Sequence, residues 1–150
     1  MVFARNSKSA ARLSKQIQNK QMQKYYYAVV HGIMPHKEGT LIDKIEKIDN
    51  KKVLLNTENG KEAKLEYKVI REKDNLSLID IHLLTGRYHQ IRLQFSSRGF
   101  PLYGDKLYGS TINDDIALSA YKLSFYHPIT KELLTFEIKP NDSAFTKFLK

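Results

Sequence analysis

A short stretch in the middle of the sequence gathers side chains that could bind an anion. From Arg87 to Arg92 it holds two arginines, a tyrosine, a histidine and a glutamine. An apolar, strand-like run ends at Thr85-Gly86 directly before it. These groups should therefore lie at one edge of a sheet, where loops and helix starts carry binding groups on a rigid base. Guanidinium and amide groups in such a place suit a phosphate or a carboxylate partner.

Other kinds of chemistry find little support in the sequence. The five histidines lack metal-ligand spacing and cysteine is absent, so we expect no metal site. The glycine-rich loops that hold nucleoside triphosphates or dinucleotides are missing. No nucleophile-elbow pattern occurs, although one sequence does not exclude a Ser-His-Asp arrangement. Arginines, amides and exposed rings remain, and these suit RNA, whose bases stack on rings and guanidinium planes.

Length and charge narrow the class of protein further. A chain of 150 residues has room for one domain with one sizeable core. Its 25 Lys and Arg against 16 Asp and Glu leave a formal net charge of +9. This excess suggests the phosphates of a nucleic acid as partner, although an unspecialised basic surface would give the same composition. No apolar run could span a bilayer and no signal-peptide pattern is present, so we expect a cytoplasmic protein without a membrane partner.

The hydrophobic pattern predicts a mixed α+β domain, with a mainly antiparallel sheet and flanking helices. Residues 1–6 look like the tail of a buried strand, and Ser7 should cap a helix to about Asn19. The inward stripe of that helix should be Ala10, Leu13 and Ile17. Strands are expected at residues 25–30, 40–48, 53–56, 63–71 and 76–84, with a closing hairpin over 116–126 and 132–138. Two more helices should cover 88–98 and begin at 143.

Three local features follow from side-chain periodicity and turn chemistry. Alternation along 25–30 places Tyr26 on one face of the sheet and Tyr25 and Tyr27 on the other. In the helix over 88–98, Ile91 and Phe95 should face the core, while Arg92 lies on a separate polar face. The pair at 59–60, Asn-Gly, should form a type I′ hairpin turn because both central residues of that turn need positive φ.

The motifs themselves closely resemble those of the RluA-like family of RNA pseudouridine synthases. The strongest likeness lies in Thr85 to Arg92 together with Gly104 to Gly109. Lys24 to Gly32 is similar to the family's K-x-Y-x-A-x-V-x-G strand, and Phe125 to Pro128 is similar to its late F-x-H-P turn. The likeness runs from Phe3 almost to Pro140 in the family's order. It implies the fold of the synthase catalytic domain.

The resemblance also implies an activity. The family's enzymes are isomerases that break the N1–C1′ bond of a uridine in RNA and rejoin the sugar to C5, without a cofactor. The base must leave the stack, and a carboxylate must act at the sugar, either as a nucleophile at C1′ or as a base at C2′. A cation must keep that carboxylate ionised. The substrate would be a structured RNA, ribosomal or transfer.

Site residues carry over from the family position by position. Tyr26 matches the tyrosine that stacks on the target base, and Arg92 matches the arginine that pairs with the catalytic aspartate. Four further residues are expected to contact the RNA: Lys24, Arg87, His89 and Gln90. A purely structural role stays open for the last three, which lie between Thr85 and Arg92.

The chain departs from the family at one important place. The family's catalytic aspartate lies in an H-R-L-D motif on a strand before the segment matched by Val2 to Asn6, and the 150 residues contain no such motif. Asp105 does not replace it, because it belongs to a structural Gly-Asp turn. We therefore expect residues 1–150 to form a partial catalytic domain that is inactive alone. Its uncovered sheet edge, near residues 1–6 or 24–31, could form an edge-strand dimer. The alternative is a non-catalytic RNA-binding module on the same scaffold.

Overall fold

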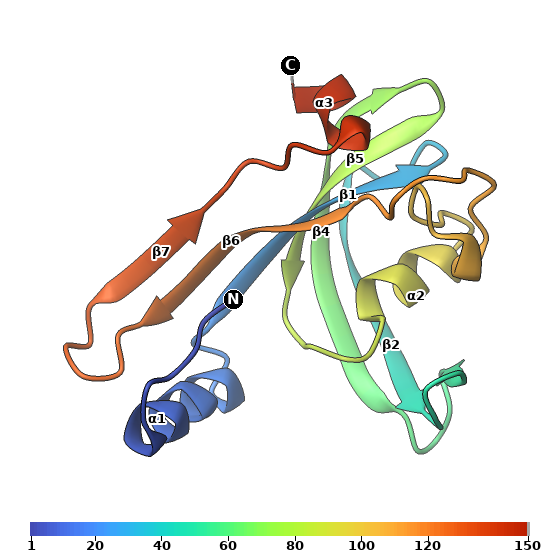
Figure 1. The fold of residues 1–150 in the computed structure, drawn as a ribbon. Helices are drawn as coiled ribbons and strands as arrows, with labels where there is room; N and C mark the ends of the chain where they lie inside the picture. The colour runs from blue at the N-terminus through green and yellow to red at the C-terminus, as the bar shows by residue number, and fades with distance from the viewer. Residues whose placement is uncertain (150) are drawn as a thin grey trace.

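A computed structural model describes residues 1–149, and its centre is one seven-stranded antiparallel sheet (Figure 1). The strands lie in the order β3-β2-β4-β5-β1-β6-β7. Their bounds are β1 Gln23–His31, β2 Glu38–Lys47, β3 Val53–Leu55, β4 Lys61–Lys73, β5 Leu76–Leu83, β6 Leu118–Tyr126 and β7 Leu133–Glu137. The helical elements are α1 Ser7–Gln18, α2 Gln90–Ser96, the 3-10 turn η1 Lys106–Tyr108 and α3 Ser143–Leu149. The predicted α+β class is confirmed.

Strand β1 runs through the interior of the sheet, between β5 and β6. Its aromatic and β-branched residues suit a pleated, half-buried surface. The predicted alternation is confirmed: Tyr26 packs against the core cluster of Ala28 and Val30, whereas Tyr27 packs with Val29 in a second cluster that includes Phe145 of α3. β1 is therefore the element that separates the two faces of the sheet.

The position of β1 corrects our expectation of an open edge. The edge strands of the sheet are β3 and β7. On one side β5 pairs with all of residues 24–31. On the other side β6 pairs with residues 24–28, and the segment around Leu102 bonds to residues 29–31. Residues 1–6 form no strand. Neither of the two places where we expected an edge-strand dimer is thus a sheet edge in this structure.

Helix α2 covers the face of the sheet that carries Ala28. Ile91 is 5% exposed and Phe95 is fully buried in the main cluster, as their spacing predicts. The helix starts two residues later than expected, because His89 adopts the left-handed conformation with φ 49° directly before Gln90. Gly99, with φ 86°, follows its end, as a glycine commonly does.

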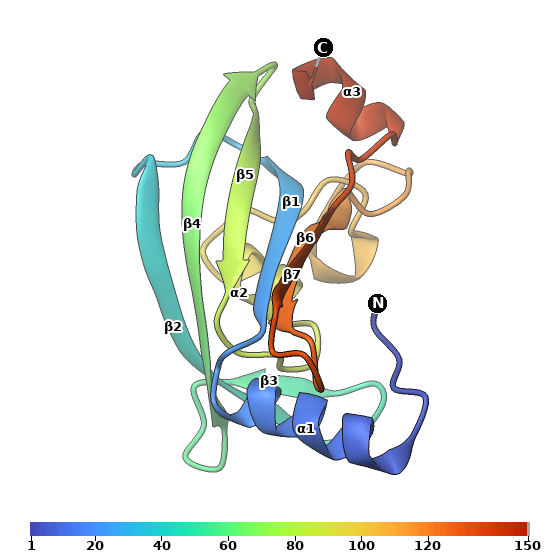
Figure 2. The ribbon, with the colours of Figure 1, turned by 90° about the vertical axis from the view of Figure 1, so that its left-hand side faces the viewer.

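Helix α1 lies beside the lower ends of the strands, while α3 lies at their upper ends (Figures 1 and 2). The side chain of Asn6, and not of Ser7, caps α1 by accepting from Ser9 N at 2.9 Å. The predicted inward stripe is only partly buried, since Leu13 is 9% and Ile17 is 52% exposed. Gln16 fixes the helix instead, through hydrogen bonds of 2.7 and 2.8 Å with the backbone of Tyr126.

The predicted turn at Asn59-Gly60 is wrong, because neither residue has a positive φ. A two-residue hairpin turn can join only strands that pair with each other. β3 and β4 lie on opposite sides of β2, so they are not neighbours. The pair with positive φ at both positions is Asp74 and Asn75, at 53° and 56°, between the paired strands β4 and β5.

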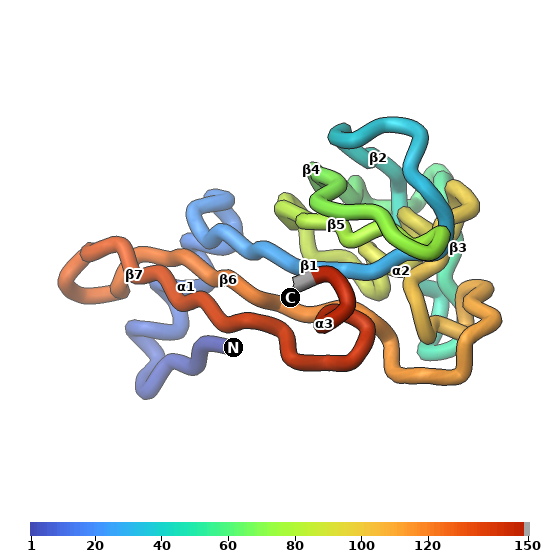
Figure 3. The backbone as a smooth tube through the Cα atoms, turned by 90° about the horizontal axis from the view of Figure 1, so that it is seen from above, coloured from blue at the N-terminus to red at the C-terminus, as the bar shows by residue number. Residues whose placement is uncertain are grey.

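The β6–β7 hairpin extends away from the part of the molecule that contains β2, β3 and α2 (Figure 3). It lies above α1 in Figure 1.

Within residues 1–149, no helix is long and apolar enough to cross a membrane.

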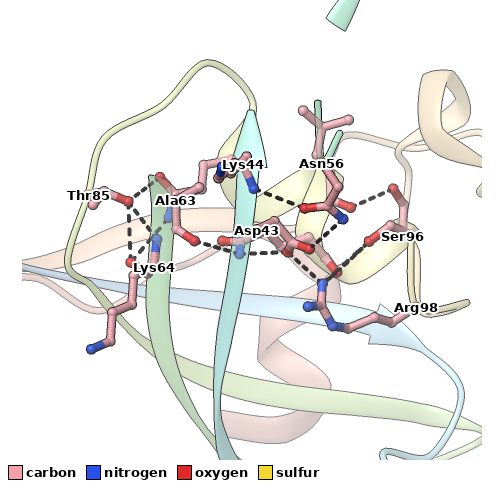
Figure 4. A network of polar contacts seen from close by, with 12 residues as sticks. Asp43, Lys44, Asn56, Ala63, Lys64, Thr85, Ser96 and Arg98 are labelled. Atoms are coloured by element: carbon pink, nitrogen blue, oxygen red, sulfur yellow. Dashed lines mark hydrogen bonds and ion pairs between the residues drawn. The ribbon is translucent and has the colours of Figure 1, made fainter. Parts of the chain in front are cut away.

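A polar network around Asp43 fastens α2 and its C-terminal turn to β2 (Figure 4). Asp43 is 7% exposed and accepts hydrogen bonds from Arg98 at 2.8 Å and Gln94 at 2.9 Å. Asn56 donates to its other carboxylate oxygen at 3.2 Å. Burial alone would raise the pKa of Asp43, but these hydrogen bonds outweigh burial and lower it.

The network predicts an acid-sensitive contribution to stability. The unfolded chain binds a proton at Asp43 near the ordinary pKa of about 3.9, whereas the folded chain binds it at lower pH. The stabilisation is therefore complete at neutral pH and is lost as pH falls through the folded pKa. Asp43→Asn should lower the free energy of unfolding by about 1–3 kcal/mol at neutral pH, measured by urea denaturation.

The gap between wild type and Asp43→Asn should narrow on acidification. Glu58→Gln, which neutralises an exposed carboxylate, serves as the control and should change stability little. A gap that stays constant down to acid pH would show that the charge of Asp43 contributes nothing.

Candidate active site

Arg92, one of the predicted site residues, has its guanidinium held by Asp105. Arg92 Nε donates to Asp105 Oδ2 at 2.7 Å, and Nη2 donates to Oδ1 at 2.9 Å. A two-pronged pair of this kind is strong and fixes the plane of the guanidinium. Asp105 is fully buried, and the side chain of Arg92 is 17% exposed. The hydrogen bonds to Asp105 raise the pKa of Arg92, so the cation is permanent.

Arg92 thus has a carboxylate partner within the chain, which the sequence did not lead us to expect. Asp105 does belong to a tight Gly-Asp turn, as predicted. Gly104 has φ 79°, and a Cβ on it would lie 2.2 Å from the carbonyl oxygen of Asp115. Only glycine fits there, and the turn places Asp105 beneath α2.

His89 is the second neighbour of Arg92. Its Nε2 lies 3.0 Å from Arg92 Nη1, and its Nδ1 lies 2.7 Å from the hydroxyl of Tyr108. Since a guanidinium can only donate, Nε2 must accept and Nδ1 must carry the proton. Burial and the charge of Arg92 lower the pKa of His89 in agreement with a neutral ring. The contacts of Arg92 with Asp105 and His89 use three of its N–H groups, so further donors are left for a second anion.

Gln90 and Arg87 brace the loop that leads into α2. Gln90 is 3% exposed, and its amide oxygen accepts from Thr85 Oγ1 at 2.8 Å and from Arg87 N at 3.0 Å. Its amide nitrogen donates to Lys64 O at 3.2 Å. These contacts favour the structural role for Gln90 over direct contact with RNA. Arg87 Nε donates to Glu62 O at 2.8 Å, and the side chain is only half-buried.

Tyr26 borders an apolar cavity of about 910 Å³ between α1 and the sheet. The walls of this apolar cavity include residues 1–4, the stripe of α1 that carries Leu13 and Ile17, and Phe136 of β7. Burial raises the pKa of the Tyr26 hydroxyl, so the ring remains a neutral phenol at physiological pH. A flat neutral ring beside a hollow of this size could stack on a base.

A second hollow, of about 290 Å³, adjoins the apolar cavity. We call it the basic hollow, because Lys20, Lys24 and Arg87 line it. Lys24 lines both spaces. The structure therefore brings Arg87 near Lys24, and Lys24 near Tyr26. Within residues 1–149 no hydrogen bond or ring contact joins Tyr26 to Arg92, although Tyr26 packs on the cluster that contains Ile91.

Two residues of the site escaped sequence reasoning in their roles, namely Asp105 and Tyr108. Both lie in the second half of the quoted motif, thirteen positions or more beyond Arg92. Their residue types were visible in the sequence, but their contact with α2 depends on the path of the loop after Leu102. A single bridge between Val30 and Leu102 sets the start of that loop.

Comparison with known proteins gives concordant matches. Residues 1–97 match the protein family described as RNA pseudouridylate synthase. An uncharacterized RNA pseudouridine synthase of Aquifex aeolicus is 35% identical over 154 residues, which cover 93% of this chain and 48% of the relative. The dual-specificity RNA pseudouridine synthase RluA of Pasteurella multocida is 32% identical, over 93% of this chain and 67% of the relative.

The fold also has a counterpart among solved structures. Human RNA pseudouridylate synthase domain containing 4 superposes with a TM-score of 0.77 at 18% identity, over 94% of this chain and 66% of that chain. The chain spans about half the length of the Aquifex relative and of the Bacillus subtilis relative YlyB.

The Arg92–Asp105 pair predicts a large penalty for removing the buried charge. Asp105→Asn keeps the shape but leaves Arg92 without its anion, so the free energy of unfolding should fall by about 3 kcal/mol. Urea denaturation followed by circular dichroism measures this loss. Asp115→Asn, at an exposed position near the same turn, is the matched control. Equal effects of the two substitutions would contradict a stabilising pair.

Proposed function

This chain belongs to the RluA-type RNA pseudouridine synthase family, and we propose that residues 1–150 are part of a catalytic domain that isomerises uridine to pseudouridine in structured RNA. The substrate we propose is ribosomal or transfer RNA, which would place the protein in the cytoplasm. The observation that carries the proposal is the fixed cation: Arg92, in the motif that identifies the family, is held by Asp105 with N–H groups to spare.

A fixed guanidinium with spare donors suits the chemistry. The carboxylate that acts at the sugar must be ionised and oriented, whether it attacks C1′ or removes a proton at C2′. We propose that Arg92 supplies this hold. The pair with Asp105 supports it, because an arginine whose plane is already fixed loses less freedom when it binds a second anion.

Tyr26 is proposed to stack on the uracil after the nucleotide leaves the helical stack, and its hydroxyl is proposed to help move the C5 proton. Its position at the rim of the apolar cavity supports this role, because the cavity offers space of low polarity next to a neutral ring. Arg87 is proposed to contact the RNA, because its hydrogen bond to Glu62 O lies at the exposed surface. His89 is proposed to keep Arg92 and Tyr108 in place from its neutral form.

We further propose that the aspartate for the reaction comes from a segment bearing the H-R-L-D motif, which the 150 residues do not contain. The test compares residues 1–150 alone with the same residues preceded by an upstream segment that carries the H-R-L-D motif. Both proteins are incubated with unmodified ribosomal and transfer RNA, and pseudouridine is measured by mass spectrometry of the nucleosides. We expect no product from the 150 residues alone and product from the extended protein.

Substitutions in the extended protein should then separate the proposed roles. Tyr26→Phe and Arg92→Ala should abolish product formation, whereas Tyr25→Phe, on the opposite face of the same strand, should not. Circular dichroism checks that Arg92→Ala still folds, and Arg92→Lys keeps the charge if it does not. Activity of residues 1–150 alone would refute the need for the aspartate. An inactive extended protein that still binds RNA would favour a non-catalytic RNA-binding module.

A further inference from the structure

The basic hollow has features of an anion site. The family resemblance suggests that Lys24 and Arg87 contact RNA, but it assigns no phosphate site and does not include Lys20. Three cationic side chains line it: Lys20 from the turn after α1, Lys24 from β1, and Arg87 from the loop before α2. No Asp or Glu is among its lining residues in the described part of the chain. Glu66 contacts His82 Nδ1 at 3.5 Å but does not line the hollow.

The walls of the basic hollow are fixed by hydrogen bonds between the elements that form it. His82 Nε2 lies 2.6 Å from Gln23 Oε1, and Gln23 Nε2 donates to Lys20 O at 3.2 Å. This chain of contacts connects β5 to β1 and to the turn after α1. Lys20 itself has φ 56°, a left-handed conformation that reverses the chain and brings its side chain to the hollow.

Arg87 is fixed in a way that leaves its outer nitrogens for another group. Its Nε donates to the carbonyl oxygen of Glu62, and this contact orients the guanidinium. Gly86 beside it is exposed, and a Cβ there would meet nothing within 4 Å. The backbone at this wall is therefore accessible to a ligand.

The basic hollow and the apolar cavity are adjacent, since Ile17, Met22 and Lys24 line both. One space is apolar and borders the ring of Tyr26, while the other is small, polar and cationic. A nucleotide in an RNA chain has the same two parts, a flat base and a phosphodiester. Charge complementarity therefore favours a phosphate at the basic end and a base at the apolar end.

We propose that the basic hollow binds a phosphodiester of the RNA chain next to the nucleotide whose base enters the apolar cavity. Lys20, Lys24 and Arg87 hold this phosphate and so set the register of the RNA relative to Tyr26. Phosphate contacts position a nucleic acid without reading its sequence. This inference rests on the proposed function, because it takes RNA as the ligand.

The first test measures the affinity of the 150-residue chain for a short single-stranded oligoribonucleotide with one uridine, by fluorescence anisotropy over a range of salt concentrations. Lys20→Gln, Lys24→Gln and Arg87→Gln should each weaken binding several-fold. Each should reduce the slope of log affinity against log salt by up to about 0.7, the value for loss of one whole phosphate contact on a single strand. Lys8→Gln and Lys51→Gln remove the same charge at exposed positions elsewhere and should leave the slope nearly unchanged. Equal effects at all five positions would overturn the proposal.

A second variant pair tests the hollow without removing any of its side chains. Gly86→Asp adds a carboxylate at the open wall, and Gly86→Asn adds a side chain of the same shape without charge. We expect Gly86→Asp to bind the oligonucleotide far more weakly than Gly86→Asn does. Equal affinity of the two variants would show that no phosphate lies there.

Two further measurements identify the anion. Replacing the phosphate next to the uridine by a methylphosphonate should weaken binding to wild type, and should weaken binding to Arg87→Gln by a smaller factor. Fully additive losses would place the phosphate elsewhere. Inorganic phosphate alone, titrated while the amide signal of Gly86 is followed by NMR, should bind more weakly than the oligonucleotide. Tighter binding of free phosphate would overturn the assignment to RNA.

The outcome is separable from that of the proposed function. If the variants of the basic hollow lose salt-dependent binding while the extended protein forms no pseudouridine, the phosphate site stands and the isomerase proposal fails. If the extended protein forms pseudouridine while the variants of the basic hollow bind RNA as well as the control variants do, the phosphate site is refuted and the isomerase proposal stands.

Discussion

The ion pair between Arg92 and Asp105 is the interaction on which the candidate site depends. It joins α2 to the Gly-Asp turn, thirteen residues further along the chain. Burying the Asp105 carboxylate without a cation would destabilise the fold, and so would burying the Arg92 guanidinium without an anion. Because each satisfies the other, the guanidinium is fixed before any ligand arrives. His89 and Tyr108 extend this order by a further pair of hydrogen bonds.

One face of the sheet contributes both to the core beneath α2 and to the apolar cavity beside α1. The face with Ala28 packs against Phe95 of α2 and forms the main core. The same face continues past Tyr26 to the apolar cavity under α1, where the packing is open rather than closed. The stripe of α1 that should have been buried borders this cavity, which explains the exposure of Ile17. Part of the excess positive charge of the chain is concentrated in the basic hollow beside the apolar cavity.

Features governed by short-range periodicity were predictable from the sequence. Tyr26 and Tyr27 alternate because strand side chains have period two, and Ile91 and Phe95 share a face because four residues make about one helical turn. Features that depend on which segments become neighbours were not. Asn59-Gly60 has hairpin composition, but β2 lies between the strands it would join. Likewise, nothing local indicates that Asp105 reaches Arg92, or that β6 covers the side of β1 we expected to be open. The family motif suggested candidate site residues, but the structure was needed to show that Gln90 is a brace and that Arg92 already has a partner.

The most direct test of this account is the side-chain NMR signal of Arg92 in the 150-residue chain without RNA. The account predicts a resolved Nε–H signal for Arg92 whose exchange with water is much slower than that of the exposed Arg5, because Nε–H donates to a buried carboxylate. Exchange as fast as that of Arg5, with an averaged chemical shift, would mean that Asp105 does not hold the guanidinium. The fixed cation at the centre of the account would then be absent.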